Sequence, residues 1–491
     1  MTKKRAIVVG SGFSGLSAST HLAHQGFEVK VFEKNTMTGG RAQQFKANGF
    51  TFDMGPSWYW MPDVFDTYFG FFGKKVSDYY RLDRLDPSYA VYFGKDHKVD
   101  IPADYKALQD LFETYEPGSA KALDKFMKEA AYKYEVGIKD LVYKPGQSLK
   151  EFIDWRVIKG VFRLQLLSSL SSHVRKYFKN PFLIELLEFP VLFLGAMPSK
   201  TPALYSLMNY ADIKLGTWYP ENGMYDIVAA MTSLAEEKGV NITCNAPVDK
   251  IIVEDGKAVG VSVKGEVHRA DVVISSADYH HTEQKLLDEP NRNYSEKYWE
   301  SRSMAPSSLL YYVGLNKKVD GLLHHNLFFD TDFGKHSEEI YKNPAWPENP
   351  LFYVSATSKT DPTTAPEGCE NLFILIPTAP GLKETPEIKE VYFNKVMERM
   401  ENLLQQSIQK NVIFRRDFAC TDFMSEYNSF KGNAYGLANT LKQTAVLKPS
   451  LKNKKIDGMY YTGQLTVPGP GVPPSLISGK VVADEVVKYF N

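Results

Sequence analysis

Three glycines near the start of the chain have the type and spacing needed to bind a dinucleotide. Gly10, Gly12 and Gly15 follow Arg5–Val9, a β-branched apolar run typical of a strand buried on both faces. In such a turn the first glycine allows a sharp bend, and the second lets a pyrophosphate approach the backbone. The third lets the next helix lie close to the sheet. The free N–H groups at the start of that helix would hold the phosphates.

An acidic residue completes this unit. Gly26 is expected to end the helix, and Glu28–Phe32 is typical of a second strand that runs into Glu33. Glu33 can accept hydrogen bonds from an adenosine ribose, and its charge would repel a 2′-phosphate, which disfavours NADP. The cofactor contacts predicted from this unit are Gly10, Ser11, Gly12, Phe13, Ser14, Gly15, Glu33 and Lys34.

Further glycine-rich segments lie after this unit and near the end of the sequence. Residues 39–41 are Gly-Gly-Arg and predict backbone and guanidinium contacts to a second part of the same cofactor. Residues 458–463 predict a strand and residues 475–489 a helix, whose start is rich in glycine and proline. We therefore predict a nucleotide domain assembled from both chain ends. Its other contacts would be Gly39, Gly40, Arg41, Gly55, Pro56, Ser57, Val248, Gly463, Gln464, Gly471, Val472 and Pro473.

Together these motifs resemble the flavin amine oxidase superfamily, which binds FAD. Within it the chain is similar, over nearly its whole length, to bacterial-type phytoene (acyclic carotenoid) desaturases. The strongest marks are Gly49-Phe50-Thr51-Phe52-Asp53-Met54-Gly55-Pro56-Ser57, Gly216-Thr217-Trp218-Tyr219-Pro220 and Pro468-Gly469-Pro470-Gly471-Val472-Pro473. The resemblance implies an FAD-dependent oxidoreductase that removes two hydrogens from an allylic –CH2–CH2– unit of a long isoprenoid, by hydride transfer to the flavin.

Three positions depart from the pattern of that family. Val467 stands where a histidine is common in the terminal flavin motif, Asn439 replaces another frequent histidine, and Lys448 replaces an arginine before Pro449. A role for those histidines therefore cannot be carried over. We expect the changes to affect the substrate more than the cofactor.

The resemblance also implies the architecture. It is an α/β fold, α+β over the whole chain, with a glutathione-reductase-like Rossmann domain, a mixed-sheet substrate domain and a helical membrane-facing subdomain. We place the FAD-binding domain at residues 1–75, 215–290 and 450–491. The substrate-binding domain would comprise residues 76–104 and 291–449, and the helical subdomain residues 105–214.

Other chemistry is poorly supported by the sequence. No serine-hydrolase elbow, zinc-protease motif or P-loop is present, and the adjacent pairs at 280–281 and 324–325 point their histidine rings apart, so no metal is expected. Glu151 and Asp154 are the carboxylates to consider as a proton acceptor, although a solvated helix face explains them better. Cys244, Cys369 and Cys420 form no Cys-x-x-Cys pair and lie outside the flavin motifs, so FAD is expected to bind non-covalently.

Composition limits the partners. Lys and Arg together number 58, as do Asp and Glu, so no overall charge directs the protein to nucleic acid. No run of 18 apolar residues exists, and a cytoplasmic protein at a membrane surface is expected. The helical insertion at about 105–205 is more apolar than a solvated helix needs. Its candidate membrane patch is Phe162, Leu166, Leu167 and Leu170, with Phe189, Val191, Leu192, Phe193 and Leu194 behind them and Lys159, Arg163, Arg175, Lys176 and Lys179 facing lipid phosphates. The alternative is that these apolar residues pack the core of the domain.

The predicted function is desaturation of phytoene or a related acyclic or hydroxylated carotenoid. Only one nucleotide fingerprint is present, so oxygen or a quinone is expected to reoxidise the flavin in place of NAD(P). A 1-hydroxycarotenoid 3,4-desaturase would share every motif. The same fold could also serve a carotene cis–trans isomerase, a non-enzymatic isoprenoid-lipid carrier or an amine oxidase.

Overall fold

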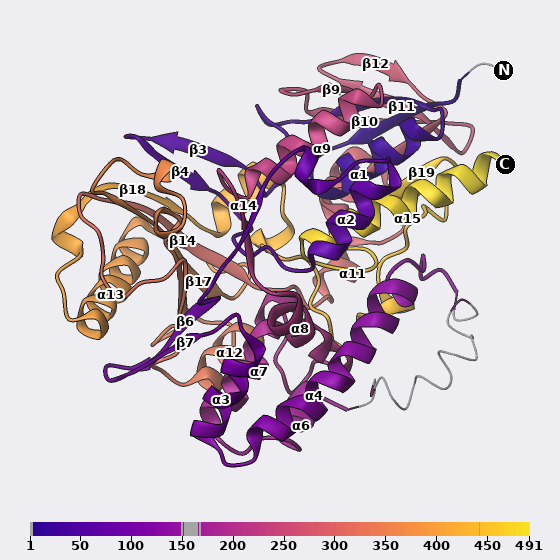
Figure 1. Cartoon of the computed structure of the whole chain (residues 1–491). Helices are drawn as coiled ribbons and strands as arrows, with labels where there is room; N and C mark the ends of the chain where they lie inside the picture. Colours follow the sequence, from indigo (N-terminus) through magenta and orange to yellow (C-terminus); the bar gives the residue numbers. More distant parts are fainter. Residues whose placement is uncertain (1–2, 149–150, 152–164, 166–167, 441) are drawn as a thin grey trace.

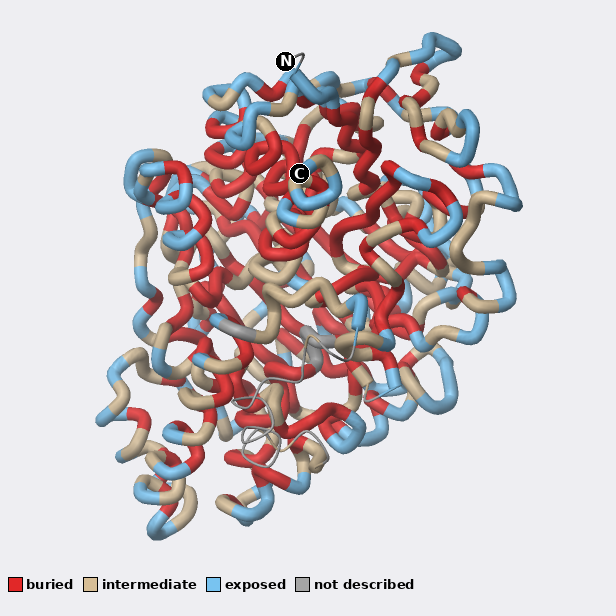
Figure 2. The backbone as a smooth tube through the Cα atoms, turned by 90° about the vertical axis from the view of Figure 1, so that its right-hand side faces the viewer, coloured by how far each residue is buried: buried red, intermediate tan, exposed pale blue. Residues whose placement is uncertain are grey.

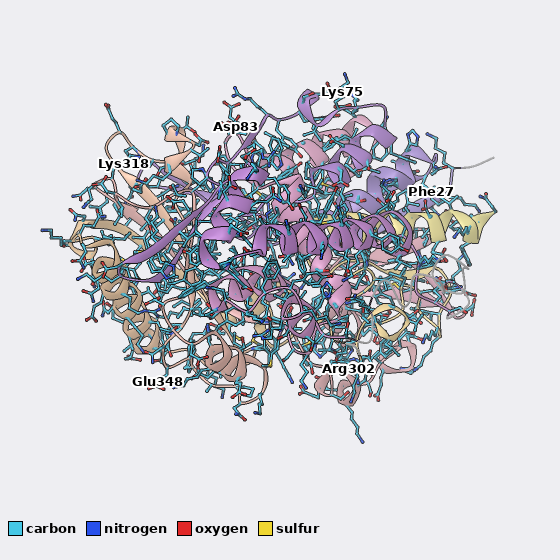
Figure 3. The ribbon with its side chains drawn as sticks, turned by 60° about the horizontal axis from the view of Figure 1, so that its bottom comes forward. Phe27, Lys75, Asp83, Arg302, Lys318 and Glu348 are labelled. Atoms are coloured by element: carbon cyan, nitrogen blue, oxygen red, sulfur yellow. The ribbon has the colours of Figure 1, made fainter. Side chains whose placement is uncertain are left out.

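The computed structural model describes residues 3–148, 151, 165, 168–440 and 442–491. Figure 1 shows two lobes joined by long crossing segments, with both chain ends close together on the same lobe. Figure 2 shows that the buried residues run continuously from one lobe into the other. In Figure 3, Phe27 marks one end of the molecule, and Lys318 and Glu348 mark the opposite end.

A parallel five-stranded sheet forms the centre of the first lobe. Its strand order is β19 (Met459–Tyr461), β13 (Val272–Ser275), β1 (Arg5–Val9), β2 (Glu28–Phe32) and β9 (Asn241–Thr243). Each neighbouring pair is parallel, so all the carboxyl ends meet at one edge. The predicted β1–turn–helix–β2 unit is confirmed, and β19 confirms that the end of the chain returns to this sheet.

The two faces of this sheet are covered differently. Three helices pack on one face, where their apolar side chains join Ala6, Val8 and Val31 in one core. They are α1 (Phe13–His24), α9 (Tyr225–Glu237) and α15 (Val472–Phe490). The antiparallel sheet β10 (Val248–Glu254), β11 (Lys257–Val263) and β12 (Glu266–Arg269) covers the other face. The hairpin predicted between β10 and β11 is confirmed.

The second lobe is built on a seven-stranded mixed sheet. Its order is β18 (Val412–Phe418), β14 (Ser307–Leu315), β17 (Glu370–Thr378), β16 (Phe352–Ser355), β15 (His325–Phe328), β6 (Tyr89–Gly94) and β7 (His97–Ile101). Alternation along the strands separates the two faces. Leu309 and Tyr311 pack under α13 (Pro386–Leu404), whereas Leu310 and Tyr312 face the core shared with the first lobe.

Shorter elements connect and cover the two lobes. The paired strands are β3 (Gln44–Ala47) with β4 (Phe50–Asp53) and β5 (Leu82–Arg84) with β8 (Trp218–Pro220). The remaining helices are α2 (Pro62–Phe71), α10 (Tyr279–His281), α11 (Glu296–Glu300), α12 (Phe333–Tyr341) and α14 (Cys420–Tyr427). The helical insertion contains α3 (Tyr105–Tyr115), α4 (Ser119–Tyr134), α6 (Leu170–Val174), α7 (Pro181–Glu188) and α8 (Leu207–Tyr210).

The structure corrects one member of the predicted membrane patch. Leu170 is completely buried, because the 170–174 helix turns this side chain into the core of the insertion. Phe189 and Val191 are also buried, which agrees with their predicted position behind the surface residues. Phe162, Leu166, Leu167, Lys159 and Arg163 lie outside the described residues. Of the predicted cations, Arg175, Lys176 and Lys179 are at least partly exposed.

Candidate functional site

A cavity of about 640 Å³ lies between the two lobes, at the carboxyl edge of the parallel sheet. All but two of the predicted cofactor residues line it. The exceptions are Ser11 and Gly15. The lining predicted from sequence is Gly10, Gly12, Phe13, Ser14, Glu33, Lys34, Gly39, Gly40, Arg41, Gly55, Pro56, Ser57, Val248, Gly463, Gln464, Gly471, Val472 and Pro473.

The three glycines of the turn have different reasons to lack a side chain. Gly10 has a φ of +93°, which only glycine adopts freely. A Cβ on Gly15 would lie 2.1 Å from the Gly10 carbonyl oxygen, so this residue allows α1 to pack against the turn. A Cβ on Gly12 would meet nothing within 4 Å and would occupy the cradle itself. The bare backbone at Gly12 is where a pyrophosphate fits.

Glu33 is held in place by the same turn. Its carboxylate accepts hydrogen bonds from the Ser11 backbone N–H at 2.8 Å, the Ser11 hydroxyl at 2.7 Å and the Asn35 N–H at 2.9 Å. Ser11 is therefore behind the site and positions the acid. Glu33 is 4% exposed and lies beside the cavity, where a ribose hydroxyl can reach its carboxylate.

Arg41 supplies the buried positive charge of the site. Its Nη2 donates to the Ser429 hydroxyl at 3.0 Å and to the Asn433 carbonyl at 3.4 Å, while Nε has no partner in the described chain. Burial lowers the pKa of Arg41, and the nearby Asp278 carboxylate opposes that shift. Burial also raises the pKa of Asp278, which caps α10. A buried guanidinium with a free N–H fits the oxygens of an anionic cofactor.

Residues from the far end of the sequence complete the polar part of the cavity. The Ser17 hydroxyl of α1 donates to the Leu476 carbonyl of α15 at 2.7 Å. Gly479 lets the two helices touch, because a Cβ there would lie 2.3 Å from the Ser14 carbonyl oxygen. The predicted start of this helix at 475 was three residues late, since Pro473 and Pro474 lie within its first turn.

The opposite part of the cavity is apolar. Its walls are Met54, Trp58, Trp60, Met61, Met208, Leu310, Phe373 and Leu375, with Tyr353 and Tyr435 as the titratable side chains among these neighbours. Sequence reasoning did not single out these residues as a site. Trp58 and Trp60 come directly after the predicted cofactor segment Gly55-Pro56-Ser57. This closeness in the sequence was the one signal that could have assigned them to the site.

A buried carboxylate holds this apolar wall. Trp60 Nε1 donates to the Thr217 hydroxyl at 2.8 Å, and that hydroxyl donates to Asp212 at 3.2 Å. The Tyr89 hydroxyl donates to the second Asp212 oxygen at 2.8 Å, and its ring packs edge-on against Trp58. Burial raises the pKa of Asp212 to about 7.

Glu151, one of the two carboxylates considered as proton acceptors, does not line the cavity. The Glu151 carboxylate accepts hydrogen bonds from the backbone N–H groups of Gly146, Gln147 and Ser148, so it caps its own turn. Asp154 lies outside the described residues.

Of the residues that depart from the family pattern, Val467 is part of the terminal flavin loop, and Asn439 and Lys448 lie behind it. Val467, Asn439 and Lys448 are buried, and none of them lines the cavity. A Cβ on Gly469 would lie 3.1 Å from Lys448 Nζ and 3.3 Å from Asn439 Oδ1. Burial lowers the pKa of Lys448 to about 7. These side chains therefore support the loop from outside the cavity.

The described residues contain no group of three or more His, Cys, Asp and Glu side chains arranged to hold a metal ion. His280 pairs with Glu296 at 3.0 Å, and His324 contacts the Thr360 hydroxyl at 2.9 Å.

Comparison with known proteins agrees with this geometry. Residues 13–487 match the family model for flavin-containing amine oxidoreductases. The chain belongs to the flavin-containing amine oxidoreductase family. It is 39% identical to a carotenoid 3,4-desaturase of Haloarcula japonica, covering 98% of this chain and 97% of the relative. It is 32% identical to a zeta-carotene-forming phytoene desaturase of Myxococcus xanthus, covering 99% and 95%.

The fold is shared with more distant solved structures. An oxidoreductase from Methanosarcina mazei aligns with a TM-score of 0.65 at 16% identity, covering 98% of this chain and all of the other. Such low identity establishes the fold alone. Membership of the family makes this chain a flavin-dependent oxidoreductase. The Gly12 cradle, Glu33 and the free Nε of Arg41 are the features of the cavity that fit a flavin nucleotide.

Proposed function

We propose that this protein is an FAD-dependent carotenoid desaturase. The supporting observation is the two-part cavity, in which a polar nucleotide half continues into an apolar half walled by tryptophan, methionine and leucine side chains. A hydrocarbon offers almost no polar group to hold, so its orientation must come from the shape of an apolar wall. Each buried CH2 group contributes about 0.8 kcal/mol, which is sufficient for tight binding of a long polyene.

The cofactor in this proposal is FAD, bound without a covalent link. Glu33 would hold the adenosine ribose, Gly12 and the start of α1 the pyrophosphate, and Arg41 with residues 471–473 the flavin end. The three cysteines are free and none lines the cavity. When bound, the flavin supplies the hydride acceptor that no amino-acid side chain can provide.

The protein's own contribution is orientation and exclusion of water. The buried Asp212–Thr217–Trp60 chain fixes one indole, and Trp58 stacks on His325 with ring centroids 4.1 Å apart. Rigid aromatic walls would place the allylic carbons against the flavin within the short distance that hydride transfer requires. In this proposal the FAD-binding domain and the substrate-binding domain expected from the sequence meet at the cavity.

The electron acceptor and the membrane surface are further parts of the proposal. One nucleotide fingerprint leaves no second site for NAD(P)H, so a quinone or oxygen would reoxidise the flavin. In the described part of the chain, no helix is both long and apolar enough to cross a membrane. A lipid-soluble substrate would then be collected at a membrane surface, where Arg175, Lys176 and Lys179 can contact anionic lipid.

The second candidate is 3,4-desaturation of a 1-hydroxylated carotenoid. The observation favouring it is the 39% identity to a carotenoid 3,4-desaturase, against 32% for the phytoene desaturase of Myxococcus xanthus. Both reactions remove two hydrogens from neighbouring carbons, so the same cavity suits them.

Pigment profiling tests the proposal. The chain would be expressed in one host that accumulates phytoene and in another that accumulates 1-hydroxylated carotenoids, with Arg41→Met as the control that weakens cofactor binding. New products with longer conjugation should appear with the wild-type chain only. Unchanged pigments in both hosts, with flavin-loaded protein present, would contradict carotenoid desaturation.

NADPH tests the electron acceptor separately. Under anaerobic conditions it should leave the flavin absorbance of the purified protein unchanged, whereas a quinone should reoxidise flavin that has been reduced by substrate. Rapid bleaching by NADPH would overturn this part.

A further inference from the structure

Desaturation removes a hydride from one carbon and a proton from its neighbour, and the destination of the proton is open. The nucleotide half of the cavity contains several charged groups, including Glu33, Lys34, Arg41 and Asp278. In the apolar half, the described lining offers two titratable groups, Tyr353 and Tyr435. A polyene held in the apolar half therefore lies against two tyrosine side chains.

These two tyrosines differ in what lies behind them. The Tyr353 hydroxyl is 2.7 Å from Nδ1 of His325, which occupies the neighbouring strand β15. His325 is completely buried, and its Nε2 has no partner in the described chain. Burial raises the pKa of both hydroxyls, to about 12 for Tyr435, but in the described chain Tyr435 has no hydrogen bond to a basic side chain.

The His325 imidazole is neutral and fixed in position. Burial lowers its pKa well below the usual value, and the neighbouring His324 adds to that shift. Stacking on Trp58, with rings 10° from parallel, holds the ring directly behind the cavity wall. In the tautomer with its proton on Nε2, Nδ1 accepts the Tyr353 hydroxyl hydrogen. This distance lies in the range needed for proton transfer.

We propose that Tyr353 takes the proton that leaves the substrate, while its own hydroxyl proton passes to His325. The inference rests on the proposed desaturase function. The bound flavin would supply the acceptor for the hydride, which leaves the first carbon with its electron pair. The neighbouring C–H bond then breaks, its electron pair forms the new C=C bond, and its proton goes to the Tyr353 oxygen. The Tyr353 hydroxyl proton moves to His325 Nδ1, which becomes imidazolium and returns the proton through Tyr353 to water after product release.

This arrangement can work with a weak base, the Tyr353–His325 pair, because the substrate C–H that it deprotonates is a very strong acid. A substrate that has lost a hydride carries positive charge, which makes its neighbouring C–H acidic. A phenol that loses its own proton as it accepts another never carries a full charge in the apolar half, where an unpaired charge is costly. Tyr353 is the catalytic residue in this scheme, and His325 acts through it.

The chain offers a matched pair of variants. Tyr353→Phe removes the hydroxyl that contacts His325, and Tyr435→Phe removes the other tyrosine hydroxyl of the same apolar half. His325→Gln keeps a hydrogen-bonding partner for Tyr353 but has no basic nitrogen. If Tyr353→Phe fails to fold, the histidine variant still tests the relay.

The experiment measures single-turnover flavin reduction in the flavin-loaded protein under anaerobic conditions. The substrate is the carotenoid identified by pigment profiling, unlabelled or deuterated at either reacting carbon. Tyr353→Phe should slow bleaching by about a hundredfold, because general base catalysis typically contributes that much or more. It should also increase the isotope effect at the carbon that loses a proton. His325→Gln should behave similarly, with a loss of about tenfold or more.

Tyr435→Phe should lose less rate than Tyr353→Phe and keep the wild-type isotope effect, and all variants should keep their flavin. A wild-type isotope effect in Tyr353→Phe and His325→Gln would overturn the proposal, as would an equal loss in Tyr435→Phe. A wild-type chain that converts no carotenoid would instead remove the proposed function, and the relay with it.

Discussion

The two halves of the cavity are built on different principles. The nucleotide half depends on backbone, with Gly10, Gly12 and Gly15 in one short turn and Glu33 held by Ser11 of the same turn. The apolar half depends on side chains brought together from distant segments, such as Trp60, Met208 and Leu375. A short motif can specify the first, whereas only the complete fold assembles the second. Substrate choice can therefore change through the apolar half without disturbing cofactor binding.

The largest expected effect distinguishes two roles within the glycine turn. Gly12→Ala places a methyl group in open space inside the cradle, so the fold should survive while flavin affinity falls by about a hundredfold. Gly15→Ala forces its Cβ against the Gly10 carbonyl, so folding itself should weaken, by about 1–3 kcal/mol or more. Flavin absorbance and melting temperature measure the two effects. Equal melting temperatures for the two variants would contradict this separation.

A charged side chain in the apolar half should slow turnover strongly but leave cofactor binding unchanged. Met208→Glu places a carboxylate beside the expected polyene, and its desolvation should cost about a hundredfold in activity. Met208→Leu is the matched control and should change activity by less than about threefold. Product analysis and flavin content are measured on the same preparations. Loss of flavin from the Glu variant would show that the halves are not independent.

Removing the charge of the ribose acid should have a smaller effect. Glu33→Gln retains the shape of the side chain but weakens its hydrogen bonds to Ser11, Asn35 and ribose, so flavin affinity should fall by about tenfold. Glu28→Gln, on the exposed face of the same strand, is the control. Titration of the apoprotein with FAD gives both dissociation constants. Equal constants would remove Glu33 from the cofactor contacts.

The smallest effect concerns the pH dependence of stability in the apolar wall. The raised pKa of Asp212, about 7, means that the folded chain holds this proton more tightly than the unfolded chain does. Its contribution to stability is therefore lost as pH rises from about 4 to 7. Asp212→Asn lacks this loss, so between about pH 5 and 8 its melting temperature should fall by a few degrees less than that of wild type. If the melting temperatures of wild type and Asp212→Asn changed with pH in parallel, Asp212 would already be ionised at the lower end of this pH range.

The contrast between the halves also explains what the sequence could predict. Gly12, Glu33 and Arg41 could be assigned because each function depends on a local pattern, and all three line the cavity. The return of the chain end was predictable from a second apolar strand followed by a glycine-rich helix start. Asp212 and Tyr353 could not be found, and His325 was considered only as a metal ligand, because the contacts of all three cross strands and loops that are separate in the sequence. Leu170 was misplaced since its apolar character fits a core as well as a surface.

The contact between α1 and α15 has a consequence for how the protein acquires its cofactor. Ser17 and Leu476 are 459 positions apart, yet they hold the two helices that border the cradle. During translation the glycine turn leaves the ribosome long before Gly463, Gly471 and Val472 exist to close the other wall. The emerging chain therefore has a nucleotide-binding motif without a closed site, and flavin loading becomes a late event in its biogenesis. Chains that stop early would remain colourless.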